Sequence, residues 1–118
     1  MIGRIDKMKR VATSDGSGVG RISPAADFTE VESDDAAKII TLPPPRIGRI
    51  VAIRNGATGY ELRSNDPEDV SINGGSGADA ESAIPANTLT ICLCDTETSY
   101  LCTNTATDGS VTTTDPAA

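Results

Sequence analysis

The sequence contains no histidine and no tryptophan, and it has only one phenylalanine and two tyrosines. Without histidine, the chain cannot build the Ser-His or Cys-His pairs that activate common enzyme nucleophiles. Paired carboxylates could still support glycoside hydrolysis, but the few aromatic side chains are too few to line a sugar-stacking cleft. We therefore expect that the protein is not an enzyme and that it has no catalytic residue and no cofactor.

Long apolar runs are also missing, since no stretch of about 20 apolar residues occurs. The net charge is −7, divided between +3 on residues 1–11 and −10 on the remainder. An acidic body repels nucleic-acid phosphates, and the basic N-terminus lacks the aromatic residues that stack on bases. We expect no membrane partner and no nucleic-acid partner. The basic terminus is then either a solvated end or an arm that docks on an acidic protein.

The chain has three cysteines, Cys92, Cys94 and Cys102, and an odd number excludes a complete disulfide framework. This usage favours folding in a reducing compartment. A zinc site would need a fourth ligand, and no histidine is present to supply it. The sequence predicts small, buried, reduced cysteines with neither a metal nor an obligatory disulfide.

The strongest apolar segments have the composition of β-strands. β-Branched residues are frequent in 38–42 and 49–54, and they suit a pleated strand. The three prolines at 43–45 end the first of these strands, and Asn55-Gly56 is a strong turn signal. A second strong strand at 88–94 is expected to pair with 99–102 as a hairpin. These patterns predict an all-β fold, either a small β-sandwich or a barrel.

The side-chain pattern also predicts which strands are covered. Residues 38–42 and 49–54 are apolar on both faces, so each strand should be covered twice, and a neighbouring subunit could supply one cover. Residues 60–63 alternate instead, which places Tyr60 and Leu62 inward and suggests an outer strand. In 88–94 the aliphatic residues Leu89, Ile91 and Leu93 share one face, and Thr90, Cys92 and Cys94 share the other.

Two polar segments have both a ligand-binding and a structural interpretation. The acidic residues Glu30, Glu32, Asp34 and Asp35 could bind calcium, but they lack the glycine and the spacing of a calcium loop. A single helical turn at 33–38, capped by Ser33, is the preferred interpretation. The glycine-rich segment 74–77 lacks the following helix and lysine of a phosphate-binding loop, so we expect a plain loop.

The N-terminus has the composition of a flexible extension. Glycine and serine dominate residues 14–18, which is typical of a linker. We therefore predict a flexible basic arm and linker at 1–18, a β domain at 19–114 and a C-terminal tail at 115–118. The arm could dock through an apolar stripe and its basic side chains. The residues expected to do so are Ile2, Arg4, Ile5, Lys7, Met8, Lys9, Arg10 and Val11.

Several short segments, spread over about residues 36–112, carry a family resemblance. They are 37–43, 48–51, 59–63, 72–75, 80–88 and 108–111. With these segments the chain resembles small structural proteins of tailed bacteriophages. The resemblance implies a virion component that has no catalytic residue.

Two roles are compatible with this resemblance. One is a capsid decoration, or cement, protein that binds the outer head surface and stabilises the joints between major capsid protein subunits. Such a protein is expected to be a homotrimer on the virion capsid surface, assembled in the host cytoplasm. The alternative is a receptor- or glycan-binding knob domain of a phage fibre. A small single domain with a docking arm favours decoration, whereas a knob would be expected to have an aromatic-lined surface.

Overall fold

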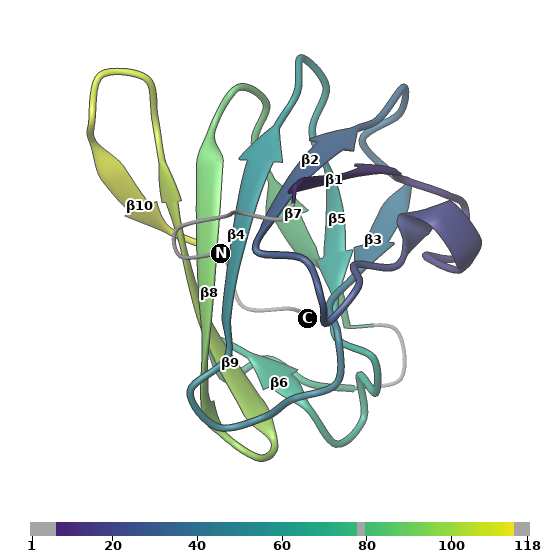
Figure 1. Ribbon diagram of the computed structural model, residues 1–118, viewed down its shortest axis with the longest axis vertical. Coiled ribbons are helices and arrows are strands. Elements are labelled where there is room, and N and C mark those ends of the chain that lie inside the picture. The colour runs from purple at the N-terminus through teal and green to yellow at the C-terminus, as the bar shows by residue number, and fades with distance from the viewer. Residues whose placement is uncertain (1–6, 78–79, 115–118) are drawn as a thin grey trace, which may run out of the picture.

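The computed structural model describes residues 7–77 and 80–114, which form two β-sheets packed face to face (Figure 1). The predicted all-β fold is confirmed, and of the two predicted architectures, sandwich and barrel, the sheets are consistent with a small sandwich. Within these two ranges, no helix is long and apolar enough to cross a membrane. The elements are β1 (Lys7–Val11), the short 3-10 helix η1 (Gly18–Gly20), β2 (Phe28–Glu32), β3 (Ile39–Thr41), β4 (Ile50–Asn55), β5 (Tyr60–Arg63), β6 (Ser71–Ile72), β7 (Ser82–Ile84), β8 (Leu89–Thr96), β9 (Ser99–Thr105) and β10 (Val111–Thr113).

The larger sheet has the strand order β1-β2-β4-β8-β9-β10, and β6 pairs with β9 beside this path. β1, β2 and β4 run parallel to one another, whereas β4, β8, β9 and β10 form an antiparallel series. The smaller sheet has the order β3-β5-β7. Figure 1 shows the small sheet lying behind the large one, with the β8–β9 hairpin running the full height of the molecule.

The predicted turns carry the chain between the two sheets. Pro43, Pro44 and Pro45 follow β3 in the small sheet and lead toward β4 in the large one. The turn at Asn55-Gly56 then returns the chain to β5. β5 is the central strand of its sheet, so the prediction of an outer strand is wrong. Its alternation reflects one solvated sheet face, which a central strand shares with its neighbours.

The core between the sheets combines aliphatic side chains with a chain of hydrogen-bonded polar groups. The Tyr60 hydroxyl donates to Asn55 Oδ1 at 2.6 Å, and Asn55 Nδ2 donates to Thr90 Oγ1 at 2.7 Å. The Thr90 hydroxyl in turn donates to Asn104 Oδ1 at 2.7 Å. Because all four residues are buried, these bonds replace the water contacts that each polar group loses.

The N-terminal arm that we predicted to be flexible is folded from Lys7 onward. Lys7–Val11 forms β1, and its five residues pair in parallel with Phe28–Glu32 of β2. Burial alternates along the strand, so Met8 and Arg10 face inward. The prediction is therefore wrong for residues 7–11, because backbone pairing with β2 orders them. Residues 1–6 lie outside the described part of the chain.

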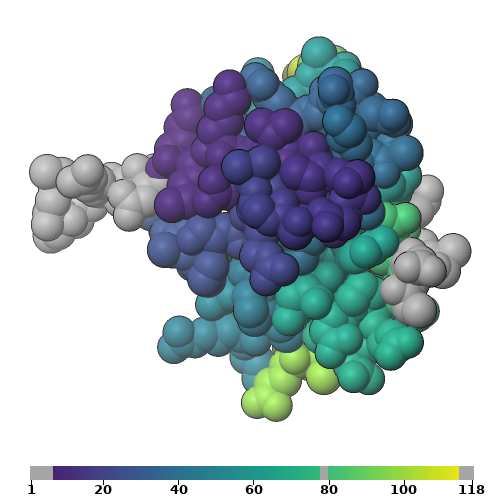
Figure 2. All heavy atoms as spheres, turned by 90° about the vertical axis from the view of Figure 1, so that its right-hand side faces the viewer, coloured from purple at the N-terminus to yellow at the C-terminus, as the bar shows by residue number. Residues whose placement is uncertain are grey.

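The predicted linker at residues 14–18 belongs to a packed segment, residues 12–22, that covers β3. Thr13 and Ile39 exchange two backbone hydrogen bonds of 3.0 and 2.7 Å, and the Ile22 amide donates to the Thr41 carbonyl at 2.9 Å. Gly16 has a φ of +73° and packs so tightly that an added Cβ would overlap Thr41 Oγ1 and lie 2.7 Å from Ile39 Cγ2. In Figure 2 this purple segment lies directly on the body. Gly16 lets the backbone of this segment lie close to β3, and it does not make the segment flexible. Because residues 12–22 pack on the β domain, the predicted domain boundary at 18/19 is wrong.

Candidate functional site

A row of exposed aliphatic side chains crosses the solvent side of the larger sheet. Ile50 on β4 lies opposite Leu93 on β8, and Leu93 lies opposite Leu101 on β9. Their exposed fractions are 62%, 41% and 51% respectively. Three neighbouring strands therefore present one continuous aliphatic row to solvent.

Two further rows of cross-strand neighbours continue this surface, and Arg54 is the one charged residue in the two rows. The first row is Ala52, Ile91 and Thr103, and the second is Arg54, Leu89, Thr105 and Val111. Leu89 remains 36% exposed and Ile91 is half-buried. We call Ile50, Leu89, Ile91, Leu93 and Leu101 the outer apolar face.

The side chains on the opposite side of β8 are unusually small and polar for buried residues. Thr90, Cys92 and Cys94 all point inward and are fully buried. Their shared face was predicted, and the structure shows that this face is the inner one. Tyr60 and Tyr100 are also fully buried between the sheets, so small partners on β8 leave room for two large rings. The leucines of the same strand are consequently left outside.

Charged pairs border the outer apolar face on the side of β1 and β2. Lys7 Nζ lies 3.0 Å from Glu30 Oε1, and Lys9 Nζ lies 3.2 Å from Glu32 Oε1. All four side chains are substantially exposed, so each pair contributes only about 0.2–1 kcal/mol. Two of the basic side chains that were predicted to dock on a partner are thus already paired within the chain.

The structure does not form the predicted apolar stripe of the arm within residues 7–11. Met8 and Val11 are three residues apart, and a strand places them on opposite sides. Arg10 turns inward and donates from its guanidinium to the Lys9 carbonyl at 3.3 Å. Of the remaining predicted docking residues, Ile2, Arg4 and Ile5 lie outside the described residues.

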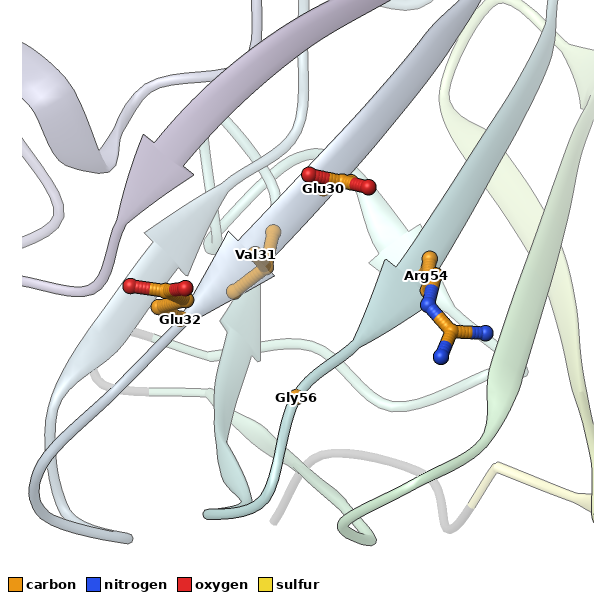
Figure 3. A pocket seen from close by; sticks show the side chains of 5 residues that line it. All are labelled: Glu30, Val31, Glu32, Arg54 and Gly56. Carbon is orange, nitrogen blue, oxygen red and sulfur yellow. The ribbon is translucent and has the colours of Figure 1, made fainter.

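A small hollow of about 170 Å³ opens beside the ends of β2 and β4. Glu30, Val31, Glu32, Arg54 and Gly56 line it (Figure 3), and the Gly56 amide donates to the Val31 carbonyl at 3.0 Å. Figure 3 shows Arg54 extending from β4 while the glutamates project from β2. Both glutamates are already paired with lysines of β1, so they are poor ligands for an added cation.

The other acidic residues of the calcium alternative are also tied to local partners. Asp34 lies 2.8 Å from the Lys38 ammonium, which lowers the pKa of that carboxyl through a hydrogen bond and charge attraction. Asp35 accepts a 2.9 Å hydrogen bond from the Ala37 amide. Within the described residues, no group of three or more potential ligands is arranged to hold a metal. The segment is an irregular turn, so the predicted helical turn is wrong. Ser33 instead bonds both backbone groups of Asp35.

All three cysteines are buried, as predicted. Burial raises the pKa of the Cys92 thiol well above its ordinary value, and the contact with Cys102 raises it further. Cys94 donates separately to the Thr96 carbonyl at 3.0 Å.

Sequence analysis missed the outer apolar face as a candidate site. One signal was present, because residues 49–54 are apolar on both faces and a neighbouring subunit was considered as one cover. The alternation in β8 could not identify the outward side, since that depends on the tyrosines of other strands. No protein-family model, curated protein or solved structure matches the chain, so its function is inferred from this geometry and from the sequence resemblance.

Proposed function

We propose that this chain is a structural protein of a tailed-bacteriophage virion that decorates the head. It binds the outer capsid surface and stabilises the joints between major capsid protein subunits. The outer apolar face is the observation that supports a docking role, and the sequence resemblance suggests the partner.

The arrangement of the exposed aliphatic side chains supports association with another protein. The outer apolar face contains five large aliphatic side chains on adjacent strands. Polar side chains such as Thr103 and Thr105 border it, which matches the apolar centre and polar rim of protein interfaces.

The energetics indicate that one copy of this surface is a modest anchor. Complete burial of a leucine or isoleucine contributes about 1.5–3 kcal/mol, and these side chains are already partly covered. Association also loses roughly 4–15 kcal/mol of translational and rotational freedom. Homotrimer formation would offset this loss, because linked copies bind with much greater avidity than one copy.

The docking role can be tested with paired threonine substitutions on the outer apolar face. Leu93→Thr with Leu101→Thr introduces β-branched residues, which suit a strand, while removing apolar surface. We expect at least tenfold weaker binding to undecorated capsids, with an unchanged circular dichroism spectrum. Val19→Thr is the matched control, because Val19 is 55% exposed on η1 and lies away from this face. Equal capsid occupancy for the double variant and the control would contradict the proposed docking surface.

Copy number tests the decoration role separately. Quantitative mass spectrometry of purified virions would measure the ratio of this chain to the major capsid protein. A ratio near that of a regular lattice component supports decoration. A handful of copies per particle would overturn it and favour the fibre knob domain.

A further inference from the structure

The β8–β9 hairpin places two of the three cysteines directly opposite each other. Cys92 is the cross-strand partner of Cys102, and their sulfur atoms lie 2.6 Å apart. Both side chains are buried, at 0% and 1% exposure. Cys94 instead lies opposite Tyr100, so the pairing selects two of the three thiols.

The backbone at this position has the geometry that brings facing residues closest. The Cys102 amide donates to Asn73 Oδ1 at 2.8 Å, and the Cys102 carbonyl accepts from Asn73 Nδ2 at 2.9 Å. Both backbone groups therefore point away from β8. Cys92 and Cys102 form a non-hydrogen-bonded antiparallel pair, whose Cα atoms are typically about 4.5 Å apart. That separation lies within the range that a disulfide can span.

We propose that Cys92 and Cys102 form an intramolecular disulfide when the protein meets an oxidising environment. The oxidant is a small-molecule disulfide. One cysteine thiolate attacks it and releases one thiol, and the second cysteine then displaces the other thiol from the mixed disulfide. The two protein thiols lose two protons and two electrons, and the small disulfide is reduced to two thiols. This proposal does not depend on the proposed function.

Burial determines when this exchange can occur. Only the thiolate attacks a disulfide, and the raised pKa of Cys92 keeps that thiol protonated in the folded hairpin. The exchange is therefore expected during folding or during transient opening of β8 and β9. Once formed, the bond fixes Leu93 opposite Leu101, because both lie one residue from the linked pair.

The test uses the full chain, refolded with oxidised and reduced glutathione and then denatured and alkylated. We expect one alkylated thiol per chain after oxidation and three after reduction. We also expect the oxidised monomer to be lighter by about 2 Da, with a Tm higher by roughly 10 °C. Trypsin cannot locate the bond, because no lysine or arginine follows Arg63. A glutamate-specific protease cuts after Glu81 and Glu97, which separates Cys102 from Cys92 and Cys94.

The variant Cys94→Ser identifies the partner on β8. A serine hydroxyl can replace the Cys94 thiol in its hydrogen bond to the Thr96 carbonyl, so the fold should be retained. We expect the linked peptides 82–97 and 98–118 from this variant as well as from the natural chain. Three alkylated thiols in the folded, glutathione-oxidised natural chain would overturn the proposal. Loss of the linked peptides in Cys94→Ser, or links only between chains, would also overturn it.

Discussion

β3 and β4 both carry isoleucines that point away from the core, but the surroundings of these isoleucines differ. Ile39 on β3 is 5% exposed because residues 12–22 pack over it, whereas Ile50 on β4 is 62% exposed. Over residues 7–77 and 80–114, no segment covers the outer apolar face. A strand that is apolar on both sides therefore predicts a second cover, but it does not show whether the same chain supplies that cover.

The largest expected effect comes from disturbing the cover of β3. In Gly16→Ala, the new methyl group would overlap Thr41 Oγ1, and the backbone φ of +73° is unfavourable for alanine. We expect a loss of about 2–4 kcal/mol in the free energy of unfolding, measured by urea denaturation. Gly18→Ala is the matched control, because Gly18 has a φ of +58° but no atom within 4 Å of the added Cβ. Equal losses for the two variants would mean that residues 12–22 do not pack on β3.

Truncating one isoleucine on each strand compares the two surfaces directly. Ile39→Ala removes a buried side chain and should lower the free energy of unfolding by about 2–4 kcal/mol. Ile50→Ala removes an exposed side chain and should change it by less than about 0.5 kcal/mol. Thermal and urea denaturation at several protein concentrations would measure both. A large, concentration-dependent loss for Ile50→Ala would show that another copy of the chain already covers the outer apolar face.

The sequence predicted the elements better than it predicted their surroundings. Alternation and β-branched residues located the main strands, and the hairpin predicted from residues 88–94 and 99–102 is formed by β8 and β9. The flexible linker predicted from the composition of residues 14–18 was wrong, because the packing of Gly16 on β3 depends on Ile39 and Thr41, which lie far along the chain. Likewise, Leu93 lies outside because distant tyrosines occupy the inner space. Local patterns carry no information about these long-range contacts.

The next prediction concerns the hydrogen bond between Tyr60 and Asn55, which belongs to the chain of buried polar groups that includes Thr90 on the inner side of β8. Tyr60→Phe leaves Asn55 Oδ1 without its donor in a buried position. We expect a loss of about 1–3 kcal/mol in the free energy of unfolding, because a buried acceptor would remain unsatisfied. Urea denaturation would measure the change. A loss below about 0.5 kcal/mol would show that this hydrogen bond does not stabilise the inner face.

Alkaline pH should lower the free energy of unfolding, because Tyr100 is buried between the sheets. Burial raises the pKa of Tyr100 to about 12, whereas a tyrosine in the unfolded chain ionises near pH 10. Its stabilising contribution is complete below about pH 10 and is lost as the pH rises toward 12. We expect the urea midpoint to fall between about pH 10 and 12. Tyr100→Phe should show a shallower fall, since the pKa of Tyr60 is raised as well. An identical pH profile in Tyr100→Phe would contradict this assignment.

The smallest expected effect concerns the charges that connect β1 to β2. Lys9 and Glu32 are about 60% exposed, so their ion pair should contribute only about 0.2–1 kcal/mol. A double-mutant cycle with Lys9→Gln and Glu32→Gln would measure that coupling, which should decrease as salt is added. β1 should stay folded in every variant, because its backbone pairs with β2 over five residues and Thr13 bonds to β3 immediately afterwards. Loss of hydrogen-exchange protection in β1 after Lys9→Gln alone would show instead that charge holds this edge strand. Residues 12–22, which cover β3, would then be held only by their own hydrogen bonds to β3 and not by the pairing of β1 with β2.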